Sequence, residues 1–117
     1  MSQFTIYHNP RCSKSRQTLA LLEESGVTPD IVEYLQVTPN SAELKAVIAK
    51  LGMTPRELLR KGEDAYRDNN LADTALTDTQ LIATMVAHPK LIERPIVIVG
   101  ERAVLGRPPE NVLALLS

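Results

Sequence analysis

IYHNPRCSKSR, residues 6–16, is the stretch that organises this chain of 117 residues. It follows a short β-type run at residues 4–7 and leads into a helical pattern that extends to Ser25. The only cysteine, Cys12, therefore lies in the turn between a strand and a helix, where the first free backbone N–H groups of the helix point. Their dipoles favour the thiolate over the thiol. Because the thiolate is the nucleophilic form, we interpret Cys12 as a candidate catalytic nucleophile.

Residues near Cys12 in the sequence could help to keep its thiol ionised. Three of them add positive charge close by in the sequence: Arg11, Lys14 and Arg16. His8 could orient the loop or place a positive charge near the sulfur, and Ser15, one helical turn on, could offer its hydroxyl to the thiolate. Ordinary roles stay open for each residue: a small buried side chain for Cys12, a hydrogen-bonded strand end for His8, and a solvent-facing first turn for Ser15.

Composition describes an ordinary globular protein. Apolar residues make up 44% and charged residues 23%, and the net charge is −1, so we expect neither nucleic acid nor a membrane as a partner. The length fits a single domain over residues 1–117. The N-terminus lacks the features of a secretory signal, and a single cysteine forms no internal disulfide, so we expect a cytoplasmic protein. If Cys12 is oxidised in turnover, the resolving thiol must come from another molecule.

Hydrophobic periodicity predicts a β-α-β opening. It consists of a strand at 4–7, a helix from 12 or 13 to 25 with Leu19 and Leu22 inward and Thr18 at the edge of that stripe, and a strand at 31–35. A helix as the crossover implies parallel pairing of the two strands. Gly26 stands where a helix end prefers glycine.

The middle of the chain predicts three helices and the end predicts a hairpin. A helical block begins at residues 38–39 and ends at Gly52, and capping boxes begin two further helices at Thr54 and Thr77. Residues 62–76 are polar and predict an irregular connection. The apolar run 96–99 predicts a central strand covered on both faces, paired with 102–105, and Pro108 opens a last helix. The resulting class is α/β: thioredoxin-like β-α-β and β-β-α halves of one sheet, with a helical insertion between them. The alternative is another small α/β sandwich with a different strand order.

Three arginines stand at loop boundaries: Arg60, Arg94 and Arg107. The planar guanidinium donates paired hydrogen bonds and stays charged, which suits it to a tetrahedral oxyanion. For each of them a solvated surface charge is the open alternative. The bond between Arg94 and Pro95 is a candidate cis peptide.

The sequence lacks the residues that several other kinds of site require. One cysteine and two histidines do not provide a zinc site of the usual type. A phosphatase-type loop needs arginine at the position of Thr18, and a dithiol site needs a second cysteine at the position of Ser15.

Four separated motifs together resemble the glutaredoxin-dependent arsenate reductase family. They are YHNP (7–10) with Cys12 and SR (15–16), LRK (59–61), ERPIV (93–97) and GRP (106–108). The resemblance implies a thioredoxin-like oxidoreductase that reduces arsenate to arsenite, with Cys12 forming a thiol-arsenate adduct, glutathione attacking next as co-substrate, and glutaredoxin resolving the mixed disulfide. No bound cofactor or metal is implied. It also implies that three arginines hold the oxyanion and its product, and that His8 and Ser15 help to keep the thiol ionised. The arginines are Arg60, Arg94 and Arg107.

The residues around the cysteine differ from the family's well-studied members. Those carry a Cys-Gly-Thr-Ser-Arg pattern, whereas this chain reads RCSKSR at 11–16, as in a sister branch. The alternatives are an Spx-like regulator of the same fold that binds RNA polymerase, and a thiol reductase for another substrate. Spx-like proteins usually carry a C-x-x-C switch, and Ser15 stands at its second position.

Overall fold

A computed structural model describes residues 3–116 of the chain. Its internal contacts form two compact units. The first combines the chain up to Val37 with the chain from Arg94 onward, and the second is Thr38–Glu93. That residues 1–117 form a single domain stays a prediction.

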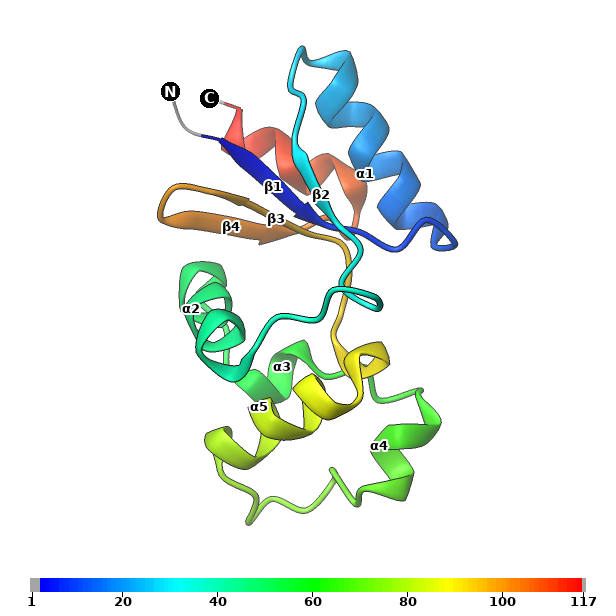
Figure 1. The fold of residues 1–117 in the computed structure, drawn as a ribbon, viewed down its shortest axis with the longest axis vertical. Coiled ribbons are helices and arrows are strands. Elements are labelled where there is room, and N and C mark those ends of the chain that lie inside the picture. Colours follow the sequence, from blue (N-terminus) through cyan, green and yellow to red (C-terminus); the bar gives the residue numbers. More distant parts are fainter. Residues whose placement is uncertain (1–2, 117) are drawn as a thin grey trace. The chain divides into compact units, whose positions relative to one another are not determined.

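The first unit contains a four-stranded mixed sheet with the order β2-β1-β3-β4 (Figure 1). Its strands are β1 (Phe4–Tyr7), β2 (Asp30–Val32), β3 (Ile96–Val99) and β4 (Arg102–Leu105). β1 pairs in parallel with β2 and antiparallel with β3, and β3 pairs antiparallel with β4. The predicted parallel β-α-β opening and the closing hairpin are therefore confirmed. The second strand is shorter than predicted, because pairing ends at Val32.

One face of this sheet is covered by two helices, α1 (Ser13–Glu24) and the 3₁₀ helix η2 (Pro109–Leu115), which pack against each other. Their shared core with β1 and β3 consists of Ile6, Leu22, Val97, Val112 and Leu115. The last helix was predicted, and the structure shows that it is 3₁₀ rather than α. On β3, Ile96 and Val97 are buried and the next two residues are only half-buried, so coverage of both faces holds for the first half of this inner strand.

The buried face of α1 is rotated from the predicted one. Ser15, Thr18 and Leu22 are buried, whereas Leu19 is only half-buried. Thr18 is thus central to the face rather than at its edge. The physical reason is that the backbone around residue 106 comes close to this face of α1, so that only small side chains fit between them. Beyond the helix, Gly26 has a φ of 85°, the left-handed conformation that glycine adopts at low cost.

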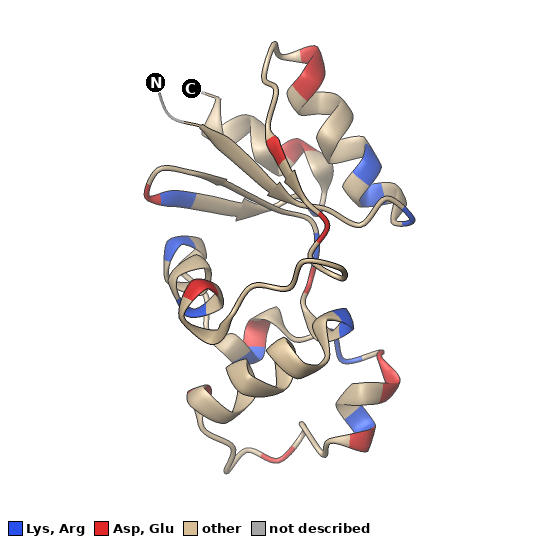
Figure 2. Cartoon of the chain, in the orientation of Figure 1, with Lys and Arg blue, Asp and Glu red and all other residues tan. Residues whose placement is uncertain are grey.

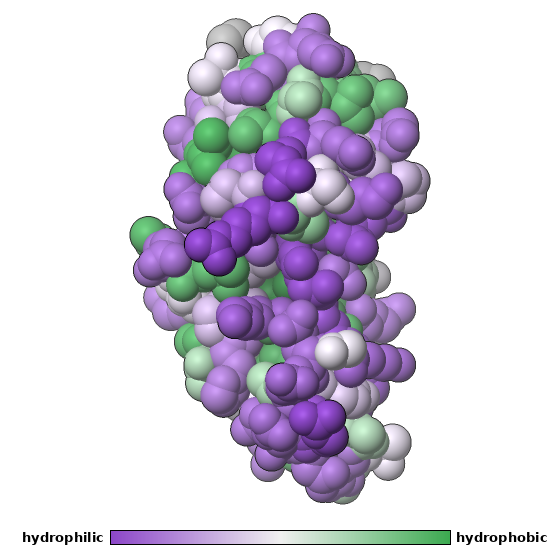
Figure 3. All heavy atoms as spheres, turned by 90° about the vertical axis from the view of Figure 1, so that its right-hand side faces the viewer, coloured by the Kyte–Doolittle hydropathy of each residue, from purple (hydrophilic) through white to green (hydrophobic). Residues whose placement is uncertain are grey.

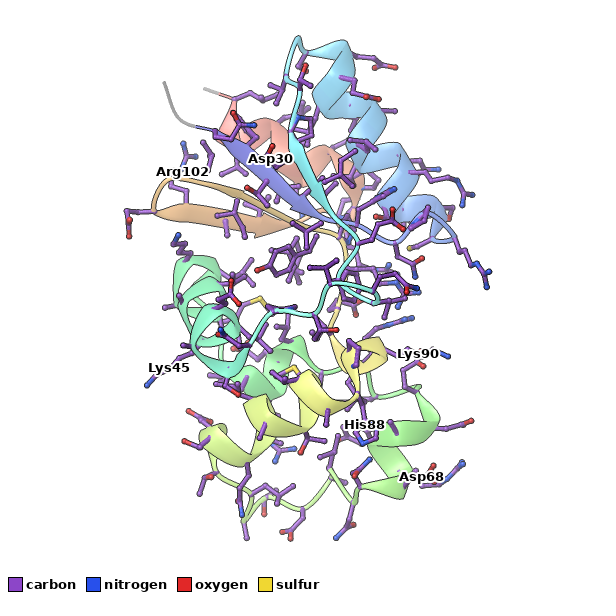
Figure 4. The ribbon with its side chains drawn as sticks, in the orientation of Figure 1. Asp30, Lys45, Asp68, His88, Lys90 and Arg102 are labelled. Atoms are coloured by element: carbon purple, nitrogen blue, oxygen red, sulfur yellow. The ribbon has the colours of Figure 1, made fainter. Side chains whose placement is uncertain are left out.

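The second unit is helical. Its helices are α2 (Ser41–Leu51), α3 (Pro55–Leu58), α4 (Asp64–Asp68), α5 (Asp78–Ala87) and the 3₁₀ helix η1 (Pro89–Leu91). The capping boxes predicted at Thr54 and Thr77 are formed, and a third occurs at Asn40. The expectation that 62–76 is irregular throughout is wrong, because α4 forms there. His88 lies where α5 ends (Figure 4).

The surface view agrees with a mainly polar exterior. On the face in Figure 3, hydrophilic side chains predominate, and hydrophobic ones occur in separate groups. None of the helices among residues 3–116 is long and apolar enough to cross a membrane.

Candidate active site

Cys12 occupies the N-cap position of α1, as predicted. Its backbone is extended, with φ −93° and ψ 122°, and its carbonyl accepts the first helical hydrogen bond from the N–H of Arg16 at 3.0 Å. The residue is half-buried. Cys12 therefore lies beside the unpaired N–H groups of the first helical turn and is partly open to solvent, as a nucleophile at this position requires.

The turn that carries Cys12 is fixed by its own side chains. The N–H of Cys12 donates to the carbonyl of Asn9 at 3.0 Å, and the Asn9 side-chain oxygen accepts from the N–H of Arg11 at 3.0 Å. Arg16 donates from Nη1 to the Pro10 carbonyl at 2.9 Å. Sequence reasoning gave Asn9 no role, although asparagine is a known turn former whose side chain accepts from the backbone N–H two residues on. Figure 2 shows Lys and Arg on the first turn of α1 and on the loop before it.

His8 and Ser15 form a buried polar pair beneath this turn. His8 Nδ1 lies 2.6 Å from Ser15 Oγ, and the N–H of Asn9 donates to the same oxygen at 3.0 Å. Ser15 is 0% exposed and His8 is 6% exposed, so the solvent-facing alternative for Ser15 is wrong. Ser15 thus ties the end of β1 to the first turn of α1.

Burial is the largest influence on His8 and lowers its pKa from 6.5. The Glu33 carboxylate acts in the opposite direction and raises the pKa, whereas the positive charge of Arg16 lowers it further. The neutral imidazole is consequently favoured at pH 7. A neutral ring fits the role of orienting the loop better than the role of placing positive charge near the sulfur.

Arg94 and Arg107 lie on neighbouring segments of the first unit. Arg107 donates from Nη1 to the Arg94 carbonyl at 3.3 Å, and the N–H of Gly106 donates to the carbonyl of Pro95 at 2.9 Å. The cis peptide predicted at Arg94–Pro95 is confirmed, and Arg107–Pro108 is cis as well. The Arg107 side chain thereby contacts the backbone of Arg94, whereas convergence of the two guanidinium groups stays a prediction.

The Gly106 segment also contacts α1. Thr18 Oγ1 lies 2.8 Å from the carbonyl oxygen of Lys14 and 3.3 Å from that of Gly106, so its hydroxyl can donate to either. From the other side, the side-chain amide of Asn111 donates to the Arg107 carbonyl at 3.1 Å. Thr18 and Asn111 were not predicted as site residues, because contacts so distant in sequence leave no local pattern.

Arg60 belongs to the second unit, and its convergence with the other arginines on Cys12 stays a prediction. Its guanidinium pairs with two carboxylates: Nη1 lies 3.2 Å from Glu63, and Nε lies 3.5 Å from Glu93. Among residues 3–116, no cluster of His, Cys, Asp and Glu side chains is suited to hold a metal ion.

The sheet order, the cysteine at the start of α1 and the cis proline before β3 define the class: an α/β protein of the thioredoxin-like kind with a helical insertion. The chain belongs to the ArsC family, whose sequence profile matches residues 7–115.

Individual relatives support this assignment. The chain is 52% identical over 116 residues to the uncharacterized protein YfgD of Escherichia coli K12, covering 98% of both chains. It is 43% identical over 117 residues to an arsenate reductase of Neisseria meningitidis, covering 99% of this chain and 100% of the relative. The structure of an arsenate reductase from Vibrio cholerae is similar with a TM-score of 0.94 at 49% identity, covering 97% of each chain.

Proposed function

We propose that this protein is an arsenate reductase that uses glutathione and glutaredoxin. The observation that carries the proposal is the half-buried thiol of Cys12 at the N-cap of α1, in a chain whose relatives include proteins named arsenate reductase. A thiol at the start of a helix lies where backbone N–H groups stabilise negative charge. Its half-exposed position leaves room for a tetrahedral oxyanion to approach.

The chemistry requires two electrons from external thiols. The Cys12 thiolate attacks arsenic and displaces one oxygen as water, forming a sulfur–arsenic(V) bond. Glutathione attacks the Cys12 sulfur, the bonding pair stays on arsenic, and arsenite leaves while a mixed disulfide forms. A glutaredoxin thiolate then takes the glutathione and releases Cys12. One arsenic(V) is reduced to arsenic(III), and two thiols become one disulfide.

The remaining residues take supporting roles in this proposal. Arg94 and Arg107, on adjacent segments, donate to the oxyanion together with Arg60. His8 and Ser15 fix the loop that carries Cys12. Ser15 argues against a regulator with a C-x-x-C redox switch. The position of the second cysteine holds a buried serine that is already hydrogen-bonded.

Arsenate-dependent turnover with glutathione and glutaredoxin, each omitted in turn, tests the proposal. We expect turnover only with the complete mixture and none with Cys12→Ser, which lacks the nucleophilic sulfur. Ser13→Ala is the matched control, since it changes an exposed residue next to the cysteine. Full activity of Cys12→Ser would reject the mechanism, and an inactive wild type in the complete mixture would favour another substrate or a regulatory protein.

A further inference from the structure

Arg60 is held on a short, well-packed piece of antiparallel backbone in the second unit. Leu59 and Ile92 form a bridge, the N–H of Arg60 donates to the Leu91 carbonyl at 2.8 Å, and the N–H of Glu93 donates to the Leu58 carbonyl at 3.0 Å. The apolar side chains of this ladder are buried: Leu58, Leu59, Leu91 and Ile92. Arg60 and Glu93 therefore follow the bridged residues on two segments that are hydrogen-bonded to each other.

Two carboxylates pair with this one guanidinium. Glu93 approaches Nε at 3.5 Å, and Glu63, whose N–H donates to the Arg60 carbonyl at 3.3 Å, approaches Nη1 at 3.2 Å. The three side chains are 24–28% exposed. By contrast, the pair of Arg67 with Asp64 is 78% and 87% exposed, and is consequently much more strongly screened by solvent.

The local charge of this cluster is −1, because two carboxylates face one guanidinium. An incoming anion at Arg60 meets repulsion from both carboxylates and competes with them for the N–H groups of the guanidinium. A tetrahedral dianion offers several oxygens for that exchange. A spherical monoanion such as chloride offers one charge and no paired acceptor geometry.

We infer that Glu63 and Glu93 act as competing internal ligands of Arg60 that set the protein's affinity and selectivity for oxyanions. This inference rests on the proposed function, in which Arg60 contacts the oxyanion. In the absence of substrate the carboxylates occupy the guanidinium. Binding of the oxyanion displaces one of them, and product release restores the pair.

Glu63→Gln and Glu93→Gln, studied separately, test this inference. Each variant keeps the shape of the side chain and removes its charge. We expect inorganic arsenate and sulfate to bind about two- to fivefold more tightly by calorimetry, the range typical of one partly exposed ion pair. We expect the KM for arsenate to fall by the same factor and inhibition by chloride to become stronger.

Asp64→Asn is the matched control, since it removes the same charge from the residue next to Glu63 without touching Arg60. An Arg60→Gln background provides the second control, because the effect of each glutamate change on affinity should disappear there. Thermal unfolding of every variant verifies that it is folded, and either glutamate variant alone is sufficient for the comparison.

Several results would overturn the inference: unchanged or weaker anion binding in both glutamate variants, an equal gain from Asp64→Asn, or no measurable binding in any of the proteins. The two proposals fail separately. Normal arsenate turnover with an unaltered KM in the glutamate variants removes the inference and leaves the function. Tighter sulfate binding in a protein without arsenate turnover removes the function and leaves the internal competition.

Discussion

Replacing Gly106 with alanine adds one methyl group at the place where the Arg107 segment meets α1. An ideal Cβ on Gly106 would lie 2.4 Å from Thr18 Oγ1, 2.9 Å from Thr18 Cγ2 and 2.8 Å from Pro95 Cγ. All three distances are below the 3.0 Å that real Cβ atoms essentially never cross. Thr18 is 0% exposed, so its side chain cannot swing into solvent. Either the helix or the segment must therefore move.

The size of the effect follows from the shortest contact. Ordinary contact begins at 3.4 Å, so the Cβ and Thr18 Oγ1 must separate by 3.4 − 2.4 = 1.0 Å. Overpacking of this kind costs about 1–3 kcal/mol of the free energy of unfolding. For a chain of this length, the Tm falls by roughly 3–15 °C. Because Arg107 is the next residue, a shift of this order at an oxyanion-binding group lowers kcat/KM for arsenate by up to about 100-fold.

Denaturant unfolding and arsenate kinetics together provide the assay. Gly62→Ala is the matched control: a Cβ on Gly62 meets nothing within 4 Å, so this variant should be as stable as the wild type or slightly more stable. Thr18→Ala removes both contacting atoms of the threonine. In the double variant, Gly106→Ala should therefore cost about 1–2 kcal/mol less than it does alone.

The double variant tests whether the contact between residues 106 and 18 causes the loss of stability. If the free-energy changes of Gly106→Ala and Thr18→Ala add within about 0.5 kcal/mol, the contact between the two residues does not cause the loss, and the reasoning is refuted. A Gly106→Ala protein with the stability of the Gly62→Ala control would refute it as well.

Two further predictions concern protonation and capping. Burial lowers the folded-state pKa of His8 below 6.5, so the unfolded chain binds more protons in the interval between the two pKa values. Stability should therefore fall as the pH drops through about 6.5, and His8→Gln should flatten that part of the stability profile; an unchanged slope in the variant would contradict this. Thr77→Ala removes the hydroxyl that accepts the Gln80 N–H at 3.2 Å and should cost about 0.5–2 kcal/mol in denaturant unfolding. Thr79→Ala, in the same first turn but without a cap role, should be close to neutral, and equal losses in both variants would argue against the capping box.

The parts of the fold that were predicted correctly depend on residues that lie close together in the sequence. The capping boxes at Thr54 and Thr77 depend on residues three positions apart, and both are formed. The position of Cys12 at a helix start follows from the strand before it and the helical pattern after it. The short α4 was missed, because its five residues, DAYRD, carry no apolar stripe and bury no side chain.

The parts that sequence did not predict depend on contacts between distant segments. Thr18 and Gly106 are in contact although they are 88 positions apart in the sequence, and no periodic pattern predicts that contact. The second carboxylate of the Arg60 cluster, Glu93, comes from a segment more than 30 positions away. The neighbouring residues Glu93 and Arg94 moreover belong to different units. The ERPIV motif (93–97) therefore contains a partner of Arg60, the Glu93 carboxylate, and a partner of Arg107, the Arg94 carbonyl.

The hydrogen bonds of the buried pair His8 and Ser15 depend on which ring nitrogen of His8 carries the proton. Ser15 Oγ accepts from the Asn9 N–H, and its own proton can donate to one acceptor only. When the neutral ring of His8 carries its proton on Nε2, Nδ1 is the acceptor, and the serine proton is used inside the pair. When the proton is on Nδ1, His8 donates to Ser15 instead, and the serine proton is available to another acceptor. The tautomer of His8 thus determines whether the serine proton is used inside the pair or can serve another acceptor.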